Sequence, residues 1–418
     1  MSMWLRLQRM LVWRHRTTAA KRAVFSFLVS ASALYLFLGF TSTTWETVTY
    51  EYDVDLDSLG NCSDIISTQE LFPDSIPPLV HWTSKSGRVP AKLVPIVRSW
   101  RLLLNVRINN SRNFSAGDQL ALLKSNNLQD FGTSNGSITN GSNKDVDSFS
   151  TDRWHFMHWD DKQISELISK HYPYLVQSYR KLVNGLERSD IGRLVVLHHV
   201  GGLYVDTDVE LLRDPTPLLR PSQLQEAGLT PNFDCESAVW SQEPIEHAAF
   251  PFDLPALISN AVMMSRANHS FLSFVLTNWP PWFQQNWAKK RGRKSIDAVH
   301  VTGPVMLQKF YKKYTALKQS DRPADWCGNM LAEPGAFHPL NDVAYVPKRL
   351  KTACAKPEKL SKLQKQFCSP LTISKLELKQ IPNTSYTVHK FMHLSYRENN
   401  FSNSIRISSI VPIFRCKV

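Results

Sequence analysis

Hydrophobic and polar positions change their spacing several times along the chain, and each change predicts an element. The short apolar segment at 76–80, which includes a double proline, predicts the first strand of the core. Residues 95–106 are typical of a helix packed behind that strand, because a proline is tolerated in the first turn of a helix. Apolar positions spaced i, i+3, i+4 and i+7 over 164–171 predict a second helix, capped by Asp160 or Asp161.

A third helix is predicted over 190–199, where most apolar residues fall on one side, and Gly201-Gly202 is expected to end it. The next three residues, 203–205, form a short apolar strand that runs into the acidic triplet 206–208. A helix, a glycine stop, a buried strand and an acidic end together indicate an α/β fold. In such folds the sheet presents polar groups at the carboxyl ends of its strands.

One apolar stretch differs from all of these, because residues 23–40 contain no charge over 18 positions. A helix of that length spans roughly 27 Å, near the lower limit for crossing a bilayer. A cleaved signal peptide and a buried soluble helix are the alternatives. The stretch ends in large residues rather than in a small-x-small exit site, which favours an uncleaved signal anchor.

Charge on either side of this stretch predicts its orientation. Residues 1–22 carry six basic groups and no acid, whereas 41–75 carry eight acids and no Lys or Arg. By the positive-inside rule the N-terminal residues are a cytosolic tail, and 41–75 form a lumenal stem. The remainder, 76–418, is then a lumenal domain, which predicts a type II membrane protein of the Golgi with a single membrane helix.

Sequons and cysteines agree with a lumenal domain. Asn-x-Ser/Thr occurs eight times, and four of these sequons fall between 109 and 142, in a stretch rich in Asn, Ser and Gly. We therefore expect 109–150 to be a glycosylated insertion loop. Six cysteines can pair in an oxidising compartment, but the sequence does not say which pair with which. They lie at positions 62, 235, 327, 354, 368 and 416.

Composition excludes several classes of protein and leaves a basic surface to explain. With 43% hydrophobic residues the chain is not mostly disordered, and 16 Gly without a period exclude a collagen. The net charge is +13, and basic runs at 289–294 and 348–379 allow a second hypothesis, a binder of polyanions. A solvated basic face is the plainer interpretation of such runs, and lumenal placement argues against nucleic acid as a partner.

The triplet Asp206-Thr207-Asp208 is the strongest chemical signal. Residues i and i+2 of an extended segment point the same way, so both carboxylates could hold a hard divalent cation that also binds a diphosphate. Such a cation stabilises negative charge on a departing diphosphate. Most isolated Asp-x-Asp triplets are solvated turns, but this one follows an apolar strand and a glycine stop.

Several segments resemble one family in the expected order. The sequence SDIGRLVVLHHVGGLYVDTDVELL (189–212) resembles the signature of the DXD-containing sugar-binding glycosyltransferases, family 32. That family includes fungal mannosyltransferases and animal α1,4-galactosyl- and α1,4-N-acetylglucosaminyltransferases. The other similar segments are IPPLVHW (76–82), HWDDKQISELISKHYPYL (158–175), ISNAVMMS (258–265), VTGPVML (301–307), FHPL (337–340) and YTVHKFMHLSY (386–396).

The resemblance implies a GT-A fold, meaning a Rossmann-like nucleotide-sugar-binding domain with a mixed sheet over 76–418. It also implies Mn²⁺ or another divalent cation and a transfer that retains an α-linkage. A hexose would pass from a nucleotide sugar to a glycan or glycolipid acceptor. The last three segments resemble the animal enzymes more, which favours a UDP-sugar donor over GDP-mannose. The competing hypothesis is a catalytically inactive lumenal relative that binds glycans or acidic polymers.

Residue roles follow from the resemblance, each beside a simpler alternative. Asp206 and Asp208 take the metal–diphosphate role, and Asp190 with Arg193 takes the donor-sugar role unless the two form only a surface ion pair. We expect Asp190, Arg193 and Asp208 to be catalytic.

Three further residues complete the expected set. Trp82 stacks on the nucleotide base or is a core residue, and Asn260 lies near a sugar or has a turn role. His389 completes the metal shell, with His393 as a substitute if that segment is helical. No catalytic nucleophile is apparent from the sequence.

Overall fold

The computed structural model of the chain describes residues 75–104, 154–219, 236–289, 297–323, 326–342, 346–369, 380–392, 404–411 and 413–414. All of them belong to one unit, Asp53–Val418. The predicted cytosolic tail, membrane helix and stem, up to residue 74, lie outside these ranges, as does the predicted loop at 109–150. Among the described residues, no helix has both the length and the apolar character needed to cross a bilayer.

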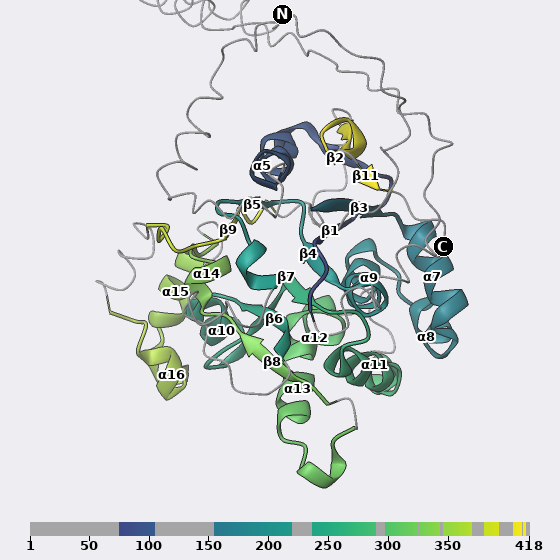
Figure 1. Cartoon of the computed structure of the whole chain (residues 1–418). Coiled ribbons are helices and arrows are strands. Elements are labelled where there is room, and N and C mark those ends of the chain that lie inside the picture. The colour runs from purple at the N-terminus through teal and green to yellow at the C-terminus, as the bar shows by residue number, and fades with distance from the viewer. Residues whose placement is uncertain are drawn as a thin grey trace, which may run out of the picture. The chain divides into compact units, whose positions relative to one another are not determined.

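A seven-stranded mixed sheet forms the centre of this unit, in the order β11-β3-β1-β4-β7-β6-β8 (Figure 1). The first four strands in that order are mutually parallel, β7 is antiparallel to both of its neighbours, and β8 is parallel to β6. The strands are β1 (Leu79–Thr83), β3 (His155–Trp159), β4 (Gly202–Val205), β6 (Glu236–Gln242), β7 (Ile258–Ser265), β8 (Gly328–Leu331) and β11 (Ile413–Phe414).

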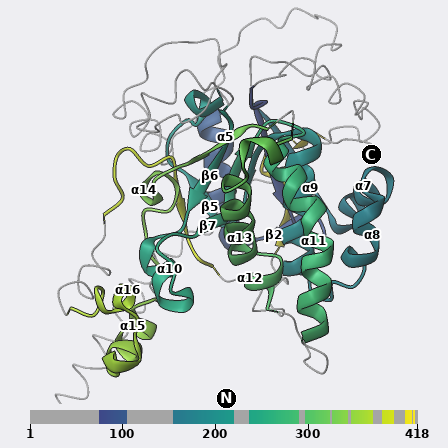
Figure 2. The same cartoon turned by 90° about the horizontal axis from the view of Figure 1, so that it is seen from below.

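Each face of the sheet has its own hydrophobic core, because side chains alternate along the strands. In β1, Leu79 enters one core, whereas Val80 and Trp82 enter the other. The first core lies under α7 (Asp161–His171), α8 (Pro173–Tyr179), α9 (Gly185–Val200), α11 (Ser270–Lys289) and α13 (Pro304–Thr315). The second lies under α5 (Val94–Leu104) and α14 (Pro334–Phe337), on the opposite side of the sheet (Figures 1 and 2).

The predicted α/β class with a mixed sheet is confirmed, and the predicted helices occur with shifted ends. Helix α7 begins with Asp160 as its N-cap in a capping box with Gln163, as the sequence indicated. Helix α9 begins five residues earlier than expected, because the side chain of Asn184 caps it by accepting from the N–H of Glu187. It ends as predicted, with Gly201 at its C-cap.

Two small antiparallel pairs and a peripheral lobe complete the described part. Strand β2 (Arg88–Pro90) pairs with β10 (Ser404–Arg406), and β5 (Val209–Leu211) pairs with β9 (Thr387–His389). The lobe contains α15 (Val346–Cys354) and α16 (Lys362–Lys365), which contact α10 (Ile245–Phe252). A disulfide between Cys354 and Cys368 closes it, in agreement with the expectation that cysteines pair. Helix α12 (Ala298–Val301) precedes α13.

The Gly201-Gly202 step matters because it turns the chain from α9 directly into β4. Both glycines have positive φ, +74° and +104°. A Cβ on Gly202 would lie 2.7 Å from the carbonyl oxygen of Leu79 and 2.8 Å from Nε2 of His81. The close approach of β4 to β1 therefore requires glycine for two reasons, backbone conformation and space.

We predict that Gly202→Ala lowers the free energy of unfolding by about 2–4 kcal/mol, because it adds both strain and overlap. Gly185→Ala is the matched control, since nothing lies within 4 Å of a Cβ there. At that position in the first turn of α9, alanine should stabilise by about 0.5–1 kcal/mol. Urea unfolding of both variants measures the difference, and equal midpoints would contradict the packing described here.

His81 lies beside this turn and is fully buried between the sheet and α9. Its Nε2 donates to the carbonyl of Gly201 at 2.7 Å, and its Nδ1 accepts from the indole N–H of Trp159 at 3.1 Å. Burial lowers the pKa of His81 to about 4, although the bond to Gly201 opposes this shift. The ring is therefore neutral, and adding a proton would break the bond from Trp159.

We predict that His81 makes the fold sensitive to acid. Its pKa is lower in the folded protein than in the unfolded chain, so its contribution to stability is complete above pH 6.5. That contribution is lost as the pH falls from 6.5 towards 4, by about 3 kcal/mol in total. His81→Gln keeps the donor to Gly201 but does not titrate. Its unfolding free energy, measured between pH 7 and pH 4.5, should fall less steeply than that of the wild type; parallel curves would contradict this assignment.

Candidate functional site

The acidic triplet lies where β4 leaves the sheet and β5 begins. Asp206 is fixed by its N–H, which donates to the carbonyl of Ala261 in β7 at 2.9 Å. The chain then turns, and the N–H of Val209 donates back to the carbonyl of Asp206 at 3.0 Å. The expectation of an extended triplet is wrong in this respect, because a tight turn rather than strand alternation brings the two carboxylates together.

Pairing between β5 and β9 brings a residue from far along the chain to this turn. Val209 stands opposite His389 in the ladder. The N–H of Lys390 donates to the carbonyl of Asp208 at 3.0 Å, and the N–H of Met392 donates to its Oδ2 at 2.9 Å. The predicted strand around His389 is thus confirmed, and its position follows from backbone hydrogen bonds rather than from side-chain attraction alone.

Asp208 and His389 form a nearly buried ion pair. Nε2 of His389 lies 3.3 Å from Oδ1 of Asp208, and the two side chains are 14% and 12% exposed. Burial alone would raise the pKa of Asp208, but the charge of His389 and the N–H of Met392 lower it to about 2. Burial alone would lower the pKa of His389, but Asp208 raises it to about 9. Each group therefore keeps the other charged.

Asp206 is held by a different set of groups. Its Oδ1 accepts from the hydroxyl of Tyr204 at 2.7 Å and is paired with Nη1 of Arg193 at 3.0 Å. The Tyr204 hydroxyl is in turn 3.0 Å from the hydroxyl of Thr83, which is 2.7 Å from that of Ser189. Since Tyr204 donates to the carboxylate, this row of hydroxyls runs towards Asp206 and fixes its orientation.

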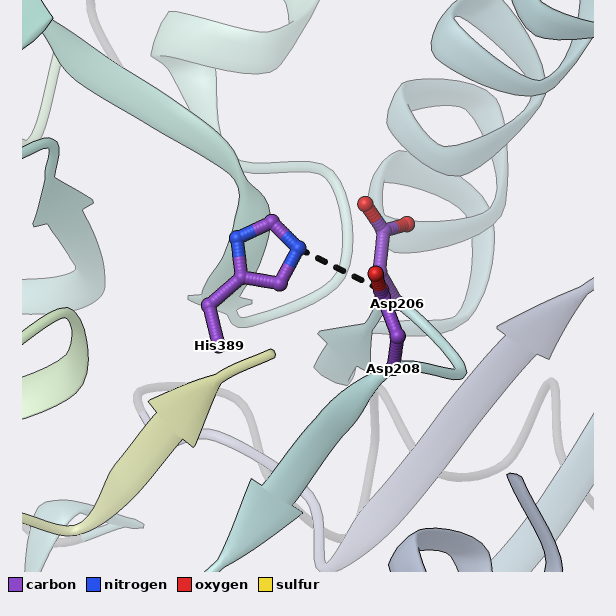
Figure 3. Close-up of side chains that lie close together, drawn as sticks. All are labelled: Asp206, Asp208 and His389. Carbon is purple, nitrogen blue, oxygen red and sulfur yellow. Dashed lines mark ion pairs between the residues drawn. The ribbon is translucent and has the colours of Figure 1, made fainter. Parts of the chain in front are cut away.

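Asp206, Asp208 and His389 together can hold a metal ion. One ligand atom from each lies within 4.8 Å of the others, and within the part of the chain described here no other such group of three occurs (Figure 3). Two carboxylates and one imidazole suit a divalent cation such as Mn²⁺. The residues predicted for a metal are therefore brought together.

The second predicted pair, Asp190 and Arg193, is buried rather than superficial, with 4% and 3% exposure. Arg193 lies 3.3 Å from Asp190 and 3.0 Å from Asp206, so one guanidinium joins both acidic groups. Its Nη1 also donates to the carbonyl of Asn260 at 2.7 Å. The alternative of a surface ion pair is excluded by this burial.

Asp190 accepts hydrogen bonds on both oxygens. The amide of Asn260 donates to Oδ1 at 2.8 Å, and the hydroxyl of Thr302 donates to Oδ2 at 2.9 Å. Burial raises the pKa of Asp190 to about 6, although Arg193, Thr302 and Asn260 oppose the shift. Asn260 stands in strand β7 rather than in a turn, and its side chain contacts Asp190. Its expected place near a sugar stays a prediction.

Trp82 requires a correction. Its ring is fully buried, stacked on Phe156 at 5.5 Å and edge-on to Trp100 at 6.3 Å. A nucleotide base cannot reach it there, because Trp82 points into the core between the sheet and α5. The alternative prediction, that Trp82 is a core residue, is confirmed. His393 lies outside the described residues.

Two residues that hydrogen-bond directly to the predicted carboxylates were not identified from the sequence. Tyr204 lies two positions before Asp206. Because residues i and i+2 of a strand point to the same side, this spacing could have predicted that the two side chains meet. Thr302 lies in the segment 301–307, which was noted only for its resemblance, and no local spacing connects it to Asp190.

Comparisons with known proteins find a family match over this part of the chain. The family described as glycosyltransferase sugar-binding region containing DXD motif matches residues 139–227. Inositol phosphoceramide mannosyltransferase 3 of Schizosaccharomyces pombe is 24% identical over 40% of this chain and 39% of its own length. From Saccharomyces cerevisiae, the mannosyl phosphorylinositol ceramide synthases CSH1 and SUR1 are 25% and 32% identical over 37% of this chain, and over 34% and 33% of their own lengths.

The chain thus spans little more than a third of the length of these relatives. Among solved structures, the ligand-free glycosyltransferase domain from the YGT toxin covers 75% of this chain and 96% of its own at 12% identity. Its TM-score of 0.33 is too low to support an argument. The matched segment contains Asp190, Arg193 and the Asp206-Thr207-Asp208 triplet, so these residues lie in the part of the chain that is similar to the DXD-containing sugar-binding region of glycosyltransferases.

Proposed function

We propose that this protein is a metal-dependent glycosyltransferase with a GT-A fold, which moves a hexose from a nucleotide sugar to a glycan or glycolipid acceptor. One observation carries the proposal. A cluster of Asp206, Asp208 and His389 stands at the carboxyl end of β4, and a buried Arg193 joins it to Asp190. Ligands of α/β sheets bind at the carboxyl ends of strands, so donor and cation would meet at this place.

The metal role falls to Asp206, Asp208 and His389. Tyr204 and Arg193 both engage Oδ1 of Asp206, so we expect its other oxygen to face the cation. When bound, a divalent cation supplies positive charge against the charge that develops on the diphosphate leaving group.

The donor-sugar role falls to Asp190 and Arg193, with Asn260 beside them. Asp190 offers carboxylate oxygens as acceptors for sugar hydroxyls, while Thr302 and Asn260 hold its orientation. Arg193 has no freedom to turn away, because Asp190, Asp206 and the carbonyl of Asn260 all hold it. Such fixed polar groups lower the cost of reorganisation during reaction. We propose that Asp190, Arg193 and Asp208 are the catalytic residues and that the product is α-linked, with retention.

Donor and acceptor follow from different observations. The names of the fungal relatives point to mannose transfer onto an inositol phosphoceramide, which supports a glycolipid acceptor and allows GDP-mannose. The resemblance of residues 301–307, 337–340 and 386–396 to animal enzymes favours a UDP-sugar instead. Hydrolysis of a panel of UDP- and GDP-sugars, with and without Mn²⁺, decides between the two donors.

Membrane attachment is the remaining part of the proposal. We propose a cytosolic tail at 1–22, a signal anchor at 23–40, a stem at 41–75 and a lumenal catalytic domain at 76–418, with a glycosylated loop at 109–150. The order of basic, apolar and acidic segments supports this arrangement. The disulfide between Cys354 and Cys368 supports an oxidising compartment such as the Golgi lumen.

We predict that Asp208→Asn abolishes most transfer while the fold stays intact. It keeps the volume of the side chain but removes a charged oxygen ligand, which should cost about 3–4 kcal/mol, or roughly two to three orders of magnitude in rate. The initial rate is measured against Mn²⁺ concentration, with melting temperature as the check on folding.

Asp214→Asn is the matched control, because its carboxylate bonds the N–H and hydroxyl of Thr216 and not the cluster. It should lose at most about 1 kcal/mol of stability and keep its rate. Full activity of Asp208→Asn with unchanged Mn²⁺ dependence would overturn the metal assignment.

We also predict that protease added to intact vesicles spares everything beyond residue 45, and that endoglycosidase lowers the apparent mass of the protein. Both follow from a lumenal domain that carries eight sequons. Digestion of the C-terminal domain without detergent would contradict the proposed topology and leave the chemistry of the site untouched.

A further inference from the structure

His389 has two ring nitrogens, and only one of them faces the carboxylates. Nε2 points to Asp208, and the other nitrogen lies on the far side of the ring (Figure 3). That second nitrogen, Nδ1, is buried and has no hydrogen-bond partner among the described residues. When Nε2 binds a metal, Nδ1 carries the hydrogen and requires an acceptor, which usually orients the ring of the ligand.

The imidazole of His338 is a candidate for that acceptor. It is fully buried, and its ring centroid lies 5.7 Å from that of His389. Glu243, an acidic group in this region, is paired with His247 at 3.0 Å and bonds Ser259. It makes no hydrogen bond to Nδ1 of His389, which has no partner among the described residues. Phe391 packs on His389 with ring centroids 4.1 Å apart, which keeps the ring in place on another side.

Hydrogen bonds around His338 determine which of its nitrogens carries a hydrogen. The hydroxyl of Ser241 donates to the carbonyl of Val262 at 2.6 Å, so this oxygen can only accept from His338. Nε2 of His338, 3.1 Å away, is therefore the donor to Ser241. Its Nδ1 is left with a lone pair, and this atom is also buried without a partner in the described part of the chain.

A buried donor on His389 and a buried acceptor on His338 thus belong to neighbouring rings, and neither atom has a hydrogen-bond partner among the described residues. Native proteins satisfy nearly all such atoms, often through a single ordered water. A centroid separation of 5.7 Å is within reach of two hydrogen bonds through one water.

We infer that His338 is a positioning residue for the metal site: its Nδ1 accepts, through one water, the hydrogen bond from Nδ1 of His389. This bond holds the His389 ring so that Nε2 faces the cation held with Asp206 and Asp208. The inference rests on the proposed metal site and adds an outer residue to it. Because the bonds from His338 to Ser241 and from Ser241 to Val262 fix the acceptor, the orientation is set by β6 and β7 of the central sheet.

The test is direct titration of the purified full-length protein with Mn²⁺, following free Mn²⁺ by electron paramagnetic resonance, so that no donor or acceptor is needed. His338→Leu removes the acceptor and should weaken Mn²⁺ binding about 10–100-fold. His338→Asn places an amide oxygen near the position of Nδ1 and should recover most of that loss. Rescue by Asn distinguishes an orienting hydrogen bond from a general packing role.

Two controls separate the possible failures. His198→Leu removes another largely buried histidine, one that bonds Tyr172 and Ser273 away from the cluster, and should leave Mn²⁺ affinity within twofold. His389→Ala removes the ligand itself. If wild type binds no Mn²⁺, or His389→Ala binds it equally well, the proposed metal site fails. If His389→Ala weakens binding but His338→Leu does not, or if Asn fails to rescue it, the inference about His338 alone is overturned.

Discussion

The guanidinium of Arg193 holds together two carboxylates that would otherwise repel each other inside the fold. Asp190 and Asp206 both lie within 3.3 Å of it, and its side chain is 4% exposed. Removing one partner of a buried charge network leaves the other charges unpaired. The free energy lost in this way is larger than the net stability that the intact network provides. The site therefore depends on Arg193 first, and the positions of Asp190 and Asp206 relative to each other are a consequence.

On the other side of the triplet, the negative charge of Asp208 is likewise compensated by an ion pair with His389. The two basic side chains come from elements far apart in sequence, Arg193 from α9 and His389 from β9. The turn between β4 and β5 lies between them. Three carboxylates face two basic groups, and the basic group on β9 is an imidazole that can give up its proton to bind a metal. This balance makes the cluster a place for an additional positive charge.

Local features of the site could be predicted from the sequence, whereas long-range ones could not. The cap at Asp160, the stop at Gly201 and the strand before Asp206 depend on a few neighbouring residues, and the structure has all three. Trp82 was ambiguous because an aromatic residue after a first strand suits a core and a ligand equally. Its burial was decided by Phe156 and Trp100, which the sequence does not connect to it.

His338 shows the same limit from another direction. Its contribution depends on which nitrogen carries a hydrogen, and that depends on Ser241 and Val262, which are distant in sequence and adjacent only in the folded sheet. No spacing rule contains such information. Tyr204 is the contrasting case. The rule that residues i and i+2 point the same way applies to Tyr204 and Asp206 as it does to Asp206 and Asp208, but only the two aspartates were predicted from it.

The pKa values of Asp190 and Asp208 differ in a way that separates the roles proposed for these two buried carboxylates. Burial raises the pKa of Asp190 to about 6, so the ionised form of this side chain destabilises the fold. The stability that this group contributes therefore increases as the pH falls from about 6 to 3.8. The pKa of Asp208 is lowered to about 2, so this carboxylate stabilises the fold above pH 3.8 and loses that contribution only below it.

Asp208 is thus ionised at all physiological pH values and can bind a cation, whereas Asp190 is a carboxylate whose ionised form is destabilised by burial. Perturbed groups of this second kind cluster at functional sites, because hydrogen-bond donors from a ligand recover what burial costs. Sugar hydroxyls are such donors, which supports the proposal that the donor sugar binds at Asp190 and the diphosphate at Asp208.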